Sequence, residues 1–183
     1  MAKDIVYFDL ETQKSANDVG GWGHKEKMLM SVGVTYSTIL DQYIVYDEAN
    51  VQQLIDQLTN ADLVIGFNHI SFDYEVLMGY TVLDLKEQIN SLDLMVDLEE
   101  KLGHRLKLES IAAASLGAGK SADGLQAIKW WREGKVKEIA EYCCYDVKVT
   151  WKVHDYGVEH GIVKYIGRHS PEPQEIAVDW KVE

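Results

Sequence analysis

The segment IVYFDLET, residues 5–12, is an apolar run that carries two carboxylates two residues apart, Asp9 and Glu11. Because side chains alternate between the two faces of a β-strand, Asp9 and Glu11 share one face. The even-numbered residues point to the other face, and Val6, Phe8 and Leu10 are all apolar. Two like charges beside a core are costly unless a positive charge lies between them. The segment therefore predicts a buried strand whose end binds a cation.

Composition limits the class of protein. A chain of 183 residues with 46% hydrophobic and 26% charged residues is typical of one globular α/β domain. We expect a single domain over residues 1–183, with a core at about 3–160 and a C-terminal tail over 161–183. The sequence has no apolar run of membrane-spanning length and no signal-peptide pattern, which predicts a cytoplasmic protein without a membrane partner.

The order of the expected elements favours a mixed sheet. Strand-like runs come first and suggest an antiparallel start, and helices alternate with a buried strand after them. The expected strands are residues 4–10, 29–36, 42–46 and 62–67, with a further edge strand in the tail segment SPEPQEIAVDW. The expected helices are residues 49–59, 71–79, 105–116 and 135–156.

Two further carboxylates occur beside apolar patterns. Asp73 follows the buried strand in the first turn of a helix, where the helix dipole alone would favour it. Asp146 lies one turn after Tyr142, and both border the apolar stripe of the helix over 135–156. Taken singly, each acid has an ordinary structural explanation.

Together, these residues resemble the DEDD superfamily of 3′-to-5′ exonucleases. The three motifs are FDLET with Asp9 and Glu11, NHISFD with Asp73, and YCCYD with Tyr142 and Asp146. The order and separation of these motifs resemble those of the superfamily, and the resemblance runs from Ile5 to about His154. The third motif carries Tyr, and the position where the other subgroup has His is Glu141, so the resemblance is to the DEDDy subgroup. Among such relatives, the chain resembles the exonuclease domains of family B DNA polymerases.

The resemblance implies a fold and a metal site. The fold is an RNase H-like α/β domain with a mixed five-stranded sheet flanked by helices. The cofactors are two divalent ions, Mg²⁺ or Mn²⁺, hard cations that bind oxygen ligands. Asp9 is expected to bridge the two ions, with Glu11 and Asp146 on the first and Asp73 on the second.

The same resemblance implies roles beyond the metal ligands. Tyr142 is expected to hydrogen-bond the attacking water, because a phenol with an ordinary pKa of about 10 stays protonated at neutral pH. Thr12, Asn68 and Phe72 are expected to hold the terminal nucleotide. Trp22, in a Gly-rich segment, either stacks on a base or covers the core.

A basic stretch lies within an acidic chain. The net charge is −12, yet residues 101–137 carry eight Lys and Arg against three acidic residues. With Trp130 and Trp131 inside it, this stretch either tracks a phosphate backbone, through Lys129, Arg132 and Lys135 among others, or forms a solvated face.

Two weaker patterns fall short of a site. The segment LGAGKS, residues 116–121, lacks the first Gly of a phosphate-binding loop, so we expect a helix end and a loop with Lys120 facing the substrate. The histidines His154, His160 and His169 have no metal-site spacing and are expected on the surface.

The predicted function is metal-dependent 3′-to-5′ hydrolysis of nucleic acid, with DNA favoured over RNA and a single-stranded 3′ end as substrate. Two alternatives stay open: a catalytically inactive nucleic-acid-binding module on the same fold, and a hydrolase of short oligonucleotides. A polymerase or helicase partner would be a separate chain.

Overall fold

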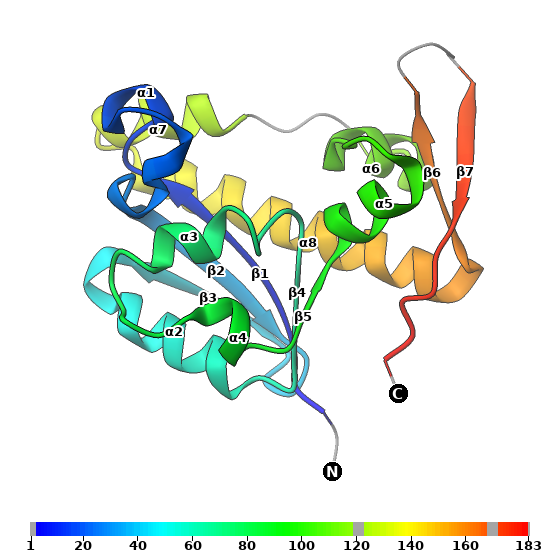
Figure 1. Cartoon of the computed structure of the whole chain (residues 1–183), viewed down its shortest axis with the longest axis horizontal. Coiled ribbons are helices and arrows are strands. Elements are labelled where there is room, and N and C mark those ends of the chain that lie inside the picture. The colour runs from blue at the N-terminus through cyan, green and yellow to red at the C-terminus, as the bar shows by residue number, and fades with distance from the viewer. Residues whose placement is uncertain (1–2, 119–122, 168–171, 183) are drawn as a thin grey trace.

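A computed structural model describes residues 3–118, 123–167 and 172–182 of the chain. Its centre is a five-stranded sheet in the order β3-β2-β1-β4-β5 (Figure 1). The strands are β1 (Ile5–Thr12), β2 (Met30–Ser37), β3 (Gln42–Asp47), β4 (Leu63–Gly66) and β5 (Ser91–Asp93). Strand β2 runs antiparallel to both β1 and β3, whereas β4 and β5 run parallel to β1. The predicted mixed five-stranded α/β sheet is confirmed.

Strand β1 lies in the middle of the sheet and follows the predicted alternation. Val6, Phe8 and Leu10 are buried in one core cluster, while Tyr7 is buried in the other. Asp9 and Glu11 are on the Tyr7 face, opposite Val34 and Val32 of β2. The carboxylates therefore lie on the side of the sheet that the C-terminal helix covers.

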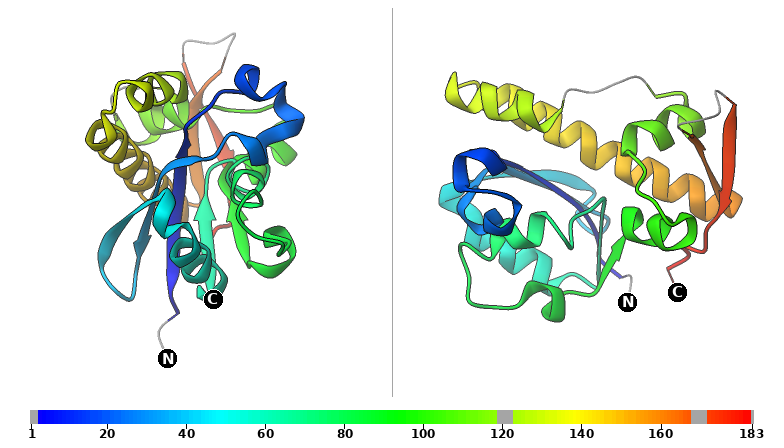
Figure 2. Two further views of the ribbon diagram at one scale, coloured as in Figure 1. Left: turned by 90° about the vertical axis from the view of Figure 1, so that its left-hand side faces the viewer. Right: turned by 45° about the horizontal axis from the view of Figure 1, so that its top comes forward.

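Helices cover both faces of the sheet, as Figure 2 shows. The face of Val6 and Phe8 packs against α2 (Val51–Asn60), α3 (Asp73–Leu77) and α4 (Leu85–Gln88). The opposite face packs against the long α8 (Val136–His160), together with α5 (Leu94–Leu102), α6 (Leu108–Leu116) and α7 (Gly124–Arg132). Short helical turns complete the chain: α1 (Ala16–Val19), η1 (Trp22–Lys27) and η2 (Glu48–Asn50).

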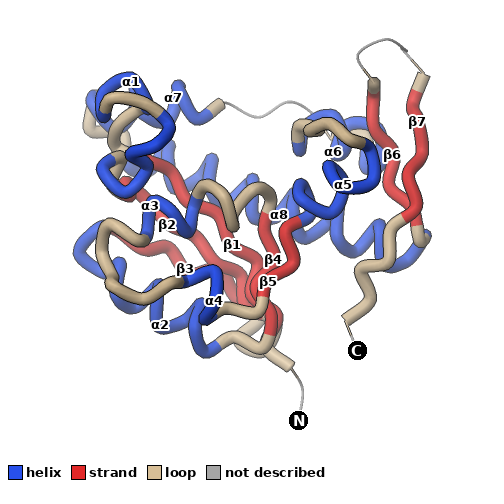
Figure 3. The backbone as a smooth tube through the Cα atoms, viewed as in Figure 1, coloured by secondary structure: helices blue, strands red, loops and turns tan. Residues whose placement is uncertain are grey.

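The tail strand does not join the main sheet. The strands β6 (Ile162–Ile166) and β7 (Pro173–Ala177) form a separate antiparallel hairpin (Figure 3). The outer edge of β6 is occupied by α6, because the Ser115 hydroxyl accepts from Lys164 N at 2.8 Å and lies 3.0 Å from Lys164 O. The expected tail strand is present as β7, and it pairs in this hairpin outside the main sheet, whose fifth strand is the three-residue β5.

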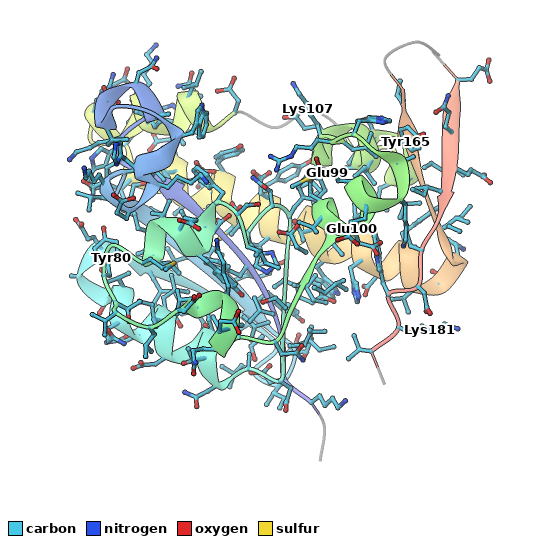
Figure 4. The ribbon with its side chains drawn as sticks, viewed as in Figure 1. Tyr80, Glu99, Glu100, Lys107, Tyr165 and Lys181 are labelled. Atoms are coloured by element: carbon cyan, nitrogen blue, oxygen red, sulfur yellow. The ribbon has the colours of Figure 1, made fainter. Side chains whose placement is uncertain are left out.

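Buried polar side chains tie distant segments to the sheet. His154 is buried, contrary to the expected surface position, because its ring bridges the Tyr7 hydroxyl and Trp180 O, each at 3.0 Å. His160 is exposed as expected, and His169 lies outside the described residues. Tyr80, labelled in Figure 4, accepts from Met30 N and donates to Glu48.

In the part of the chain that the structure describes, no helix has both the length and the apolarity to cross a membrane.

Candidate active site

Three carboxylates from two elements converge at the end of β1. Asp9 and Glu11 come from the strand and Asp146 comes from α8. One oxygen of each lies within 4.8 Å of the others. The strand alternation turns the first two toward α8, and the helix turns Asp146 toward the strand. Segments more than 130 residues apart in the sequence thus form one acidic cluster.

Asp73 lies beside this cluster as the first residue of α3. It is buried, and its Oδ1 accepts a hydrogen bond from the backbone amide of Leu10 at 3.0 Å. Strand β4 runs parallel to β1, so the loop that follows β4 reaches the same end of the sheet as Asp9. Asp73 is outside the closest group of three, but its charge acts on Asp9 and Glu11.

The neighbouring α8 residues complete the surroundings of the acids. Tyr142 precedes Asp146 by one turn and contacts Trp130 edge to face, with ring centroids 6.3 Å apart. The buried Cys143 thiol donates toward Asp9, its Sγ lying 3.3 Å from Oδ2 and 3.4 Å from the backbone oxygen. Cys144 is half-buried, and the two cysteines are free.

The acids strongly perturb one another. Burial, followed by the charges of Asp73, Glu11 and Asp146, raises the pKa of Asp9 well above its ordinary value. Burial and neighbouring carboxylates likewise raise the pKa of Glu11. Burial is the main cause that raises the pKa of Asp73 to about 8, against the opposing hydrogen bond from Leu10. Burial and the nearby acids also raise the pKa of Tyr142, so its hydroxyl keeps its proton across the neutral range.

The donor set suits a hard divalent cation. Three carboxylate groups within reach of one point provide oxygen ligands of the kind that Mg²⁺ and Mn²⁺ prefer. No Lys or Arg is paired with Asp9 or Glu11 among the ion pairs of the described residues. A bound cation would offset the mutual repulsion that raises these pKa values. The residues present therefore fit a metal centre.

Two adjoining cavities of about 770 and 650 Å³ meet at the acids. The shared lining residues are Asp9, Phe67, Asn68, Asp123, Gly124, Tyr142 and Asp146. The first cavity extends under the connection between α5 and α6, which contributes Arg105 and Lys107. The second extends toward Thr12, Trp22 and Phe72. A ligand at the acids can therefore extend in two directions.

The structure places the expected substrate residues as follows. Asn68 lines both cavities, while Thr12 and Phe72 line the second. Lys120 lies outside the described residues. Trp22 is 68% exposed and contacts Phe72 edge to face at 6.4 Å. Covering the core is thus the wrong alternative for Trp22, and its ring faces the second cavity.

The basic residues singled out from the sequence are mostly engaged with acids. Arg132 pairs with Asp18 at 2.8 Å, and Lys135 pairs with Glu133 at 2.7 Å. Lys129 is exposed and lines neither cavity. Within the described ranges, the Lys and Arg residues that line the first cavity are Arg105 and Lys107. Figure 4 labels Lys107 at the start of α6, at the end of the molecule that also carries Glu99.

Sequence reasoning missed two residues near the acids. Asp123 lines both cavities and caps α7 by accepting from Gln126 N at 2.9 Å. Asp93 ends β5 and caps α5. Both precede a helix, and an acidic residue at that position is an N-cap signal that could have located both helices.

Comparison with solved structures supports the fold. The family B DNA polymerase of the hyperthermophilic archaeon Pyrobaculum calidifontis has a similar structure, with a TM-score of 0.55 and 13% sequence identity. The match covers 86% of this chain and 25% of the polymerase chain, so the likeness concerns the fold of a quarter of that protein. No curated protein matches.

A family model supplies the assignment. The model RNase_H_2, described as RNase H superfamily, matches residues 6–158, a range that includes Asp9, Glu11, Tyr142 and Asp146. The resemblance seen in the three motifs is confirmed by this match and by the polymerase fold. The chain belongs to the RNase_H_2 family of the RNase H superfamily.

Proposed function

We propose that this protein is a metal-dependent 3′-to-5′ exonuclease that hydrolyses phosphodiester bonds, with single-stranded DNA favoured over RNA. The observation that carries the proposal is the approach of Asp9, Glu11 and Asp146 to within 4.8 Å of one another. Family and fold support a nuclease-type function, and the position of the acids between two cavities gives a strand room on both sides.

The acids would hold two divalent ions, Mg²⁺ or Mn²⁺. The charges of Glu11, Asp146 and Asp73 all act on Asp9, which would contact both ions. Glu11 and Asp146 would bind the first ion and Asp73 the second. Such ions activate a water and stabilise the leaving oxygen of a phosphodiester.

Tyr142 and the cavity residues would orient the reactants. The protonated hydroxyl of Tyr142 is a donor beside Asp146, where it can hold the attacking water without taking its proton. Thr12, Asn68 and Phe72 would hold the terminal nucleotide, and the exposed ring of Trp22 offers a stacking surface for its base. Lys120 remains a proposed phosphate contact.

One alternative rests on the cavities. Together they could enclose a short oligonucleotide as readily as the end of a long strand, so hydrolysis of short oligonucleotides is the second candidate. If the protein hydrolyses short oligonucleotides, it would not need a polymerase or helicase on a separate chain as a partner.

The test is digestion of 5′-labelled DNA and RNA strands of several lengths, with Mg²⁺, Mn²⁺ or chelator. We expect a ladder that shortens from the 3′ end, only with metal, at a rate that varies little with length. Preference for strands of a few nucleotides would select the second candidate. If the folded protein shows no metal-dependent cleavage and its Asp146→Asn variant behaves identically, both candidate functions are refuted.

A further inference from the structure

The carboxylate of Asp93 joins two segments that both reach the acids. Asp93 is 4% exposed. Its Oδ1 accepts from Asn68 N at 2.8 Å, and its Oδ2 accepts from Ile70 N at 3.1 Å. The same Oδ1 accepts from Met95 N at 3.1 Å and Val96 N at 3.3 Å, which caps α5. One buried carboxylate thus binds the turn over 67–72 to the start of a helix that follows a different strand.

The turn over 67–72 has an unusual backbone that needs such support. Asn68 has a φ of 66°, in the left-handed region that residues other than Gly adopt at a cost. Its carbonyl accepts from Phe72 N at 3.1 Å, so the turn closes on itself directly before Asp73. Hydrogen bonds from the Asn68 and Ile70 amides to a buried charge are of the stronger kind. They are suited to hold the turn in this conformation.

The side chain beneath the turn lies beside Asp93. The His69 ring is fully buried, and its Nδ1 lies 3.5 Å from Asp93 Oδ2. Gly66 makes room for it, since a Cβ at that position would lie 2.6 Å from Nδ1. Burial lowers the pKa of His69 to about 4, so the ring is neutral near pH 7. His69 therefore fills space under the turn and does not replace the hydrogen bonds of Asp93.

The orientation of Asn68 leaves a donor for a ligand. The Ser71 hydroxyl donates to Asn68 Oδ1 at 3.1 Å, which fixes the direction of the amide. Among the described residues, no protein acceptor binds the Nδ2 of Asn68, and this residue lines both cavities where they meet at the acids. An amide N–H at this point suits an oxygen of the bound nucleotide.

We propose that Asp93 is a positioning residue. By holding the backbone of the turn over 67–72, it places the side-chain amide of Asn68 to donate to an oxygen of the terminal nucleotide. The inference rests on the proposed function for its substrate. The role of Asp93 in shaping the turn is separable from that function, since it concerns the protein alone.

The test uses a substitution that keeps the helix cap and removes the bridge. Asp93→Ser retains a good N-cap for α5, but its short side chain cannot reach Asn68 or Ile70. The matched control is Asp84→Ser, which changes the exposed N-cap of α4, away from both cavities. For Asp93→Ser we expect KM for a single-stranded oligonucleotide to rise about tenfold, the equivalent of one lost hydrogen bond. We expect kcat and the Mn²⁺ dissociation constant to change by less than about threefold, and Asp84→Ser to change none of these values.

A double-mutant cycle separates positioning from general destabilisation. If Asp93 acts through the Asn68 amide, Asp93→Ser should add little to the KM of an Asn68→Ala variant. Equal effects of Asp93→Ser with and without the Asn68 side chain would overturn the proposal. If Asp93→Ser fails to fold, Asp93→Asn serves instead: its side-chain oxygen keeps the cap and the Asn68 N–H, and its amide group opposes the Ile70 N–H, so the turn is expected to loosen at Ile70.

Hydrogen exchange gives a reading that does not depend on catalysis. In the metal-free protein, we expect Asp93→Ser to speed exchange of the Asn68 and Ile70 amides while the amides of α8 keep their protection. Unchanged exchange at those two amides would refute the positioning role even if the protein digests DNA. Should the wild type bind no nucleic acid, the proposed function and the substrate contact of Asn68 both fail, and the exchange result alone decides the role in the turn.

Discussion

At the scale of single residues, the acids of the site are held by neutral donors on their inner side. Cys143 contacts Asp9, and the Leu10 amide binds Asp73. Neither donor carries a charge, so neither neutralises the cluster, and the pKa of each acid stays raised. This arrangement orients the carboxylates for a cation while leaving their charge to be balanced by that cation.

Substitution of Tyr142 tests the role of its hydroxyl. Tyr142→Phe keeps the ring against Trp130 and removes only the donor beside Asp146. If the hydroxyl orients the attacking water, the single-turnover rate should fall by about 10²- to 10⁴-fold while Mn²⁺ affinity is retained. An unchanged single-turnover rate would remove Tyr142 from the reaction.

Cys143 offers a finer test of metal-ligand orientation. Cys143→Val keeps an apolar side chain of similar size but removes the donor to Asp9, whereas Cys143→Ser keeps a donor with a shorter reach. We expect Mn²⁺ affinity by calorimetry to fall about fivefold in Cys143→Val, as for one weak hydrogen bond, and less in Cys143→Ser. Cys144→Val is the control, since no hydrogen bond joins Cys144 to Asp9 in the described structure. If the Cys143→Val protein binds Mn²⁺ as tightly as the wild type, the thiol has no orienting role.

At the scale of elements, we expect phosphate contacts in the connection before α6, because its basic residues line the first cavity. Arg132 and Lys135 are paired with acids, whereas Arg105 and Lys107 line the first cavity. Arg105 also pairs with Glu99 at 3.1 Å through its Nε, an exposed pair of the kind that contributes little stability. A phosphate could displace such a partner.

Charge reversal distinguishes the two basic elements. Changing Arg105 and Lys107 together to Glu should weaken binding of single-stranded DNA and lower the log-log salt slope by about 0.7 per lost phosphate contact. The same change at Arg132 and Lys135 should leave the slope unaltered. Titration at three salt concentrations measures both, and equal slopes for the two double variants would contradict a substrate path through the first cavity.

The elements also show what the sequence could predict. The alternation of residues 5–12 correctly places Asp9 and Glu11 on one face, because a central strand buried on both sides leaves little freedom of register. Strand β5 was missed because three residues are too few for a period, and its pairing with β4 is a tertiary contact. Helix α7 was missed because the mixture of basic and aromatic residues over 129–132 indicates a surface and shows no clear apolar stripe.

The site shows the same division. Asp146 and Tyr142 could be predicted because a long helix has a regular period. The hydrogen bonds of Asp93, the ion pair of Arg132 with Asp18, and the burial of His154 join segments far apart in the sequence. No local pattern encodes those contacts, so only the folded chain reveals them.

At the scale of the whole molecule, the acidic cluster joins β1, α3 and α8, so its electrostatics act on global stability. The folded pKa of Asp73 is raised to about 8, and those of Asp9 and Glu11 are raised as well. In the unfolded chain these groups ionise near pH 4. The folded state therefore binds their protons more tightly, and their stabilising contribution is complete below about pH 4 and lost as the pH rises through the folded pKa values, that of Asp73 being about 8.

Melting measurements test this coupling. For chelator-treated protein we expect the melting temperature to fall between about pH 5 and pH 8. Mn²⁺ should raise the melting temperature most at the upper end of that range. At a hundredfold excess over its dissociation constant, Mn²⁺ should add about 2.7 kcal/mol to the free energy of unfolding. Asp9→Asn should blunt the Mn²⁺ effect without destabilising the metal-free form at pH 8. A metal-free Asp9→Asn protein that melts well below the wild type, with equal Mn²⁺ shifts in both, would make Asp9 a structural residue.

Anomalous scattering from Mn²⁺-soaked crystals is the most direct test of whether Asp9, Glu11, Asp73 and Asp146 form a divalent metal centre. We expect one anomalous peak in contact with Asp9, Glu11 and Asp146 and a second on the Asp73 side of Asp9, with both weakened in crystals of Asp9→Asn. Saturating Mn²⁺ that gives peaks elsewhere on the protein, and none within ligand distance of Asp9, would contradict it.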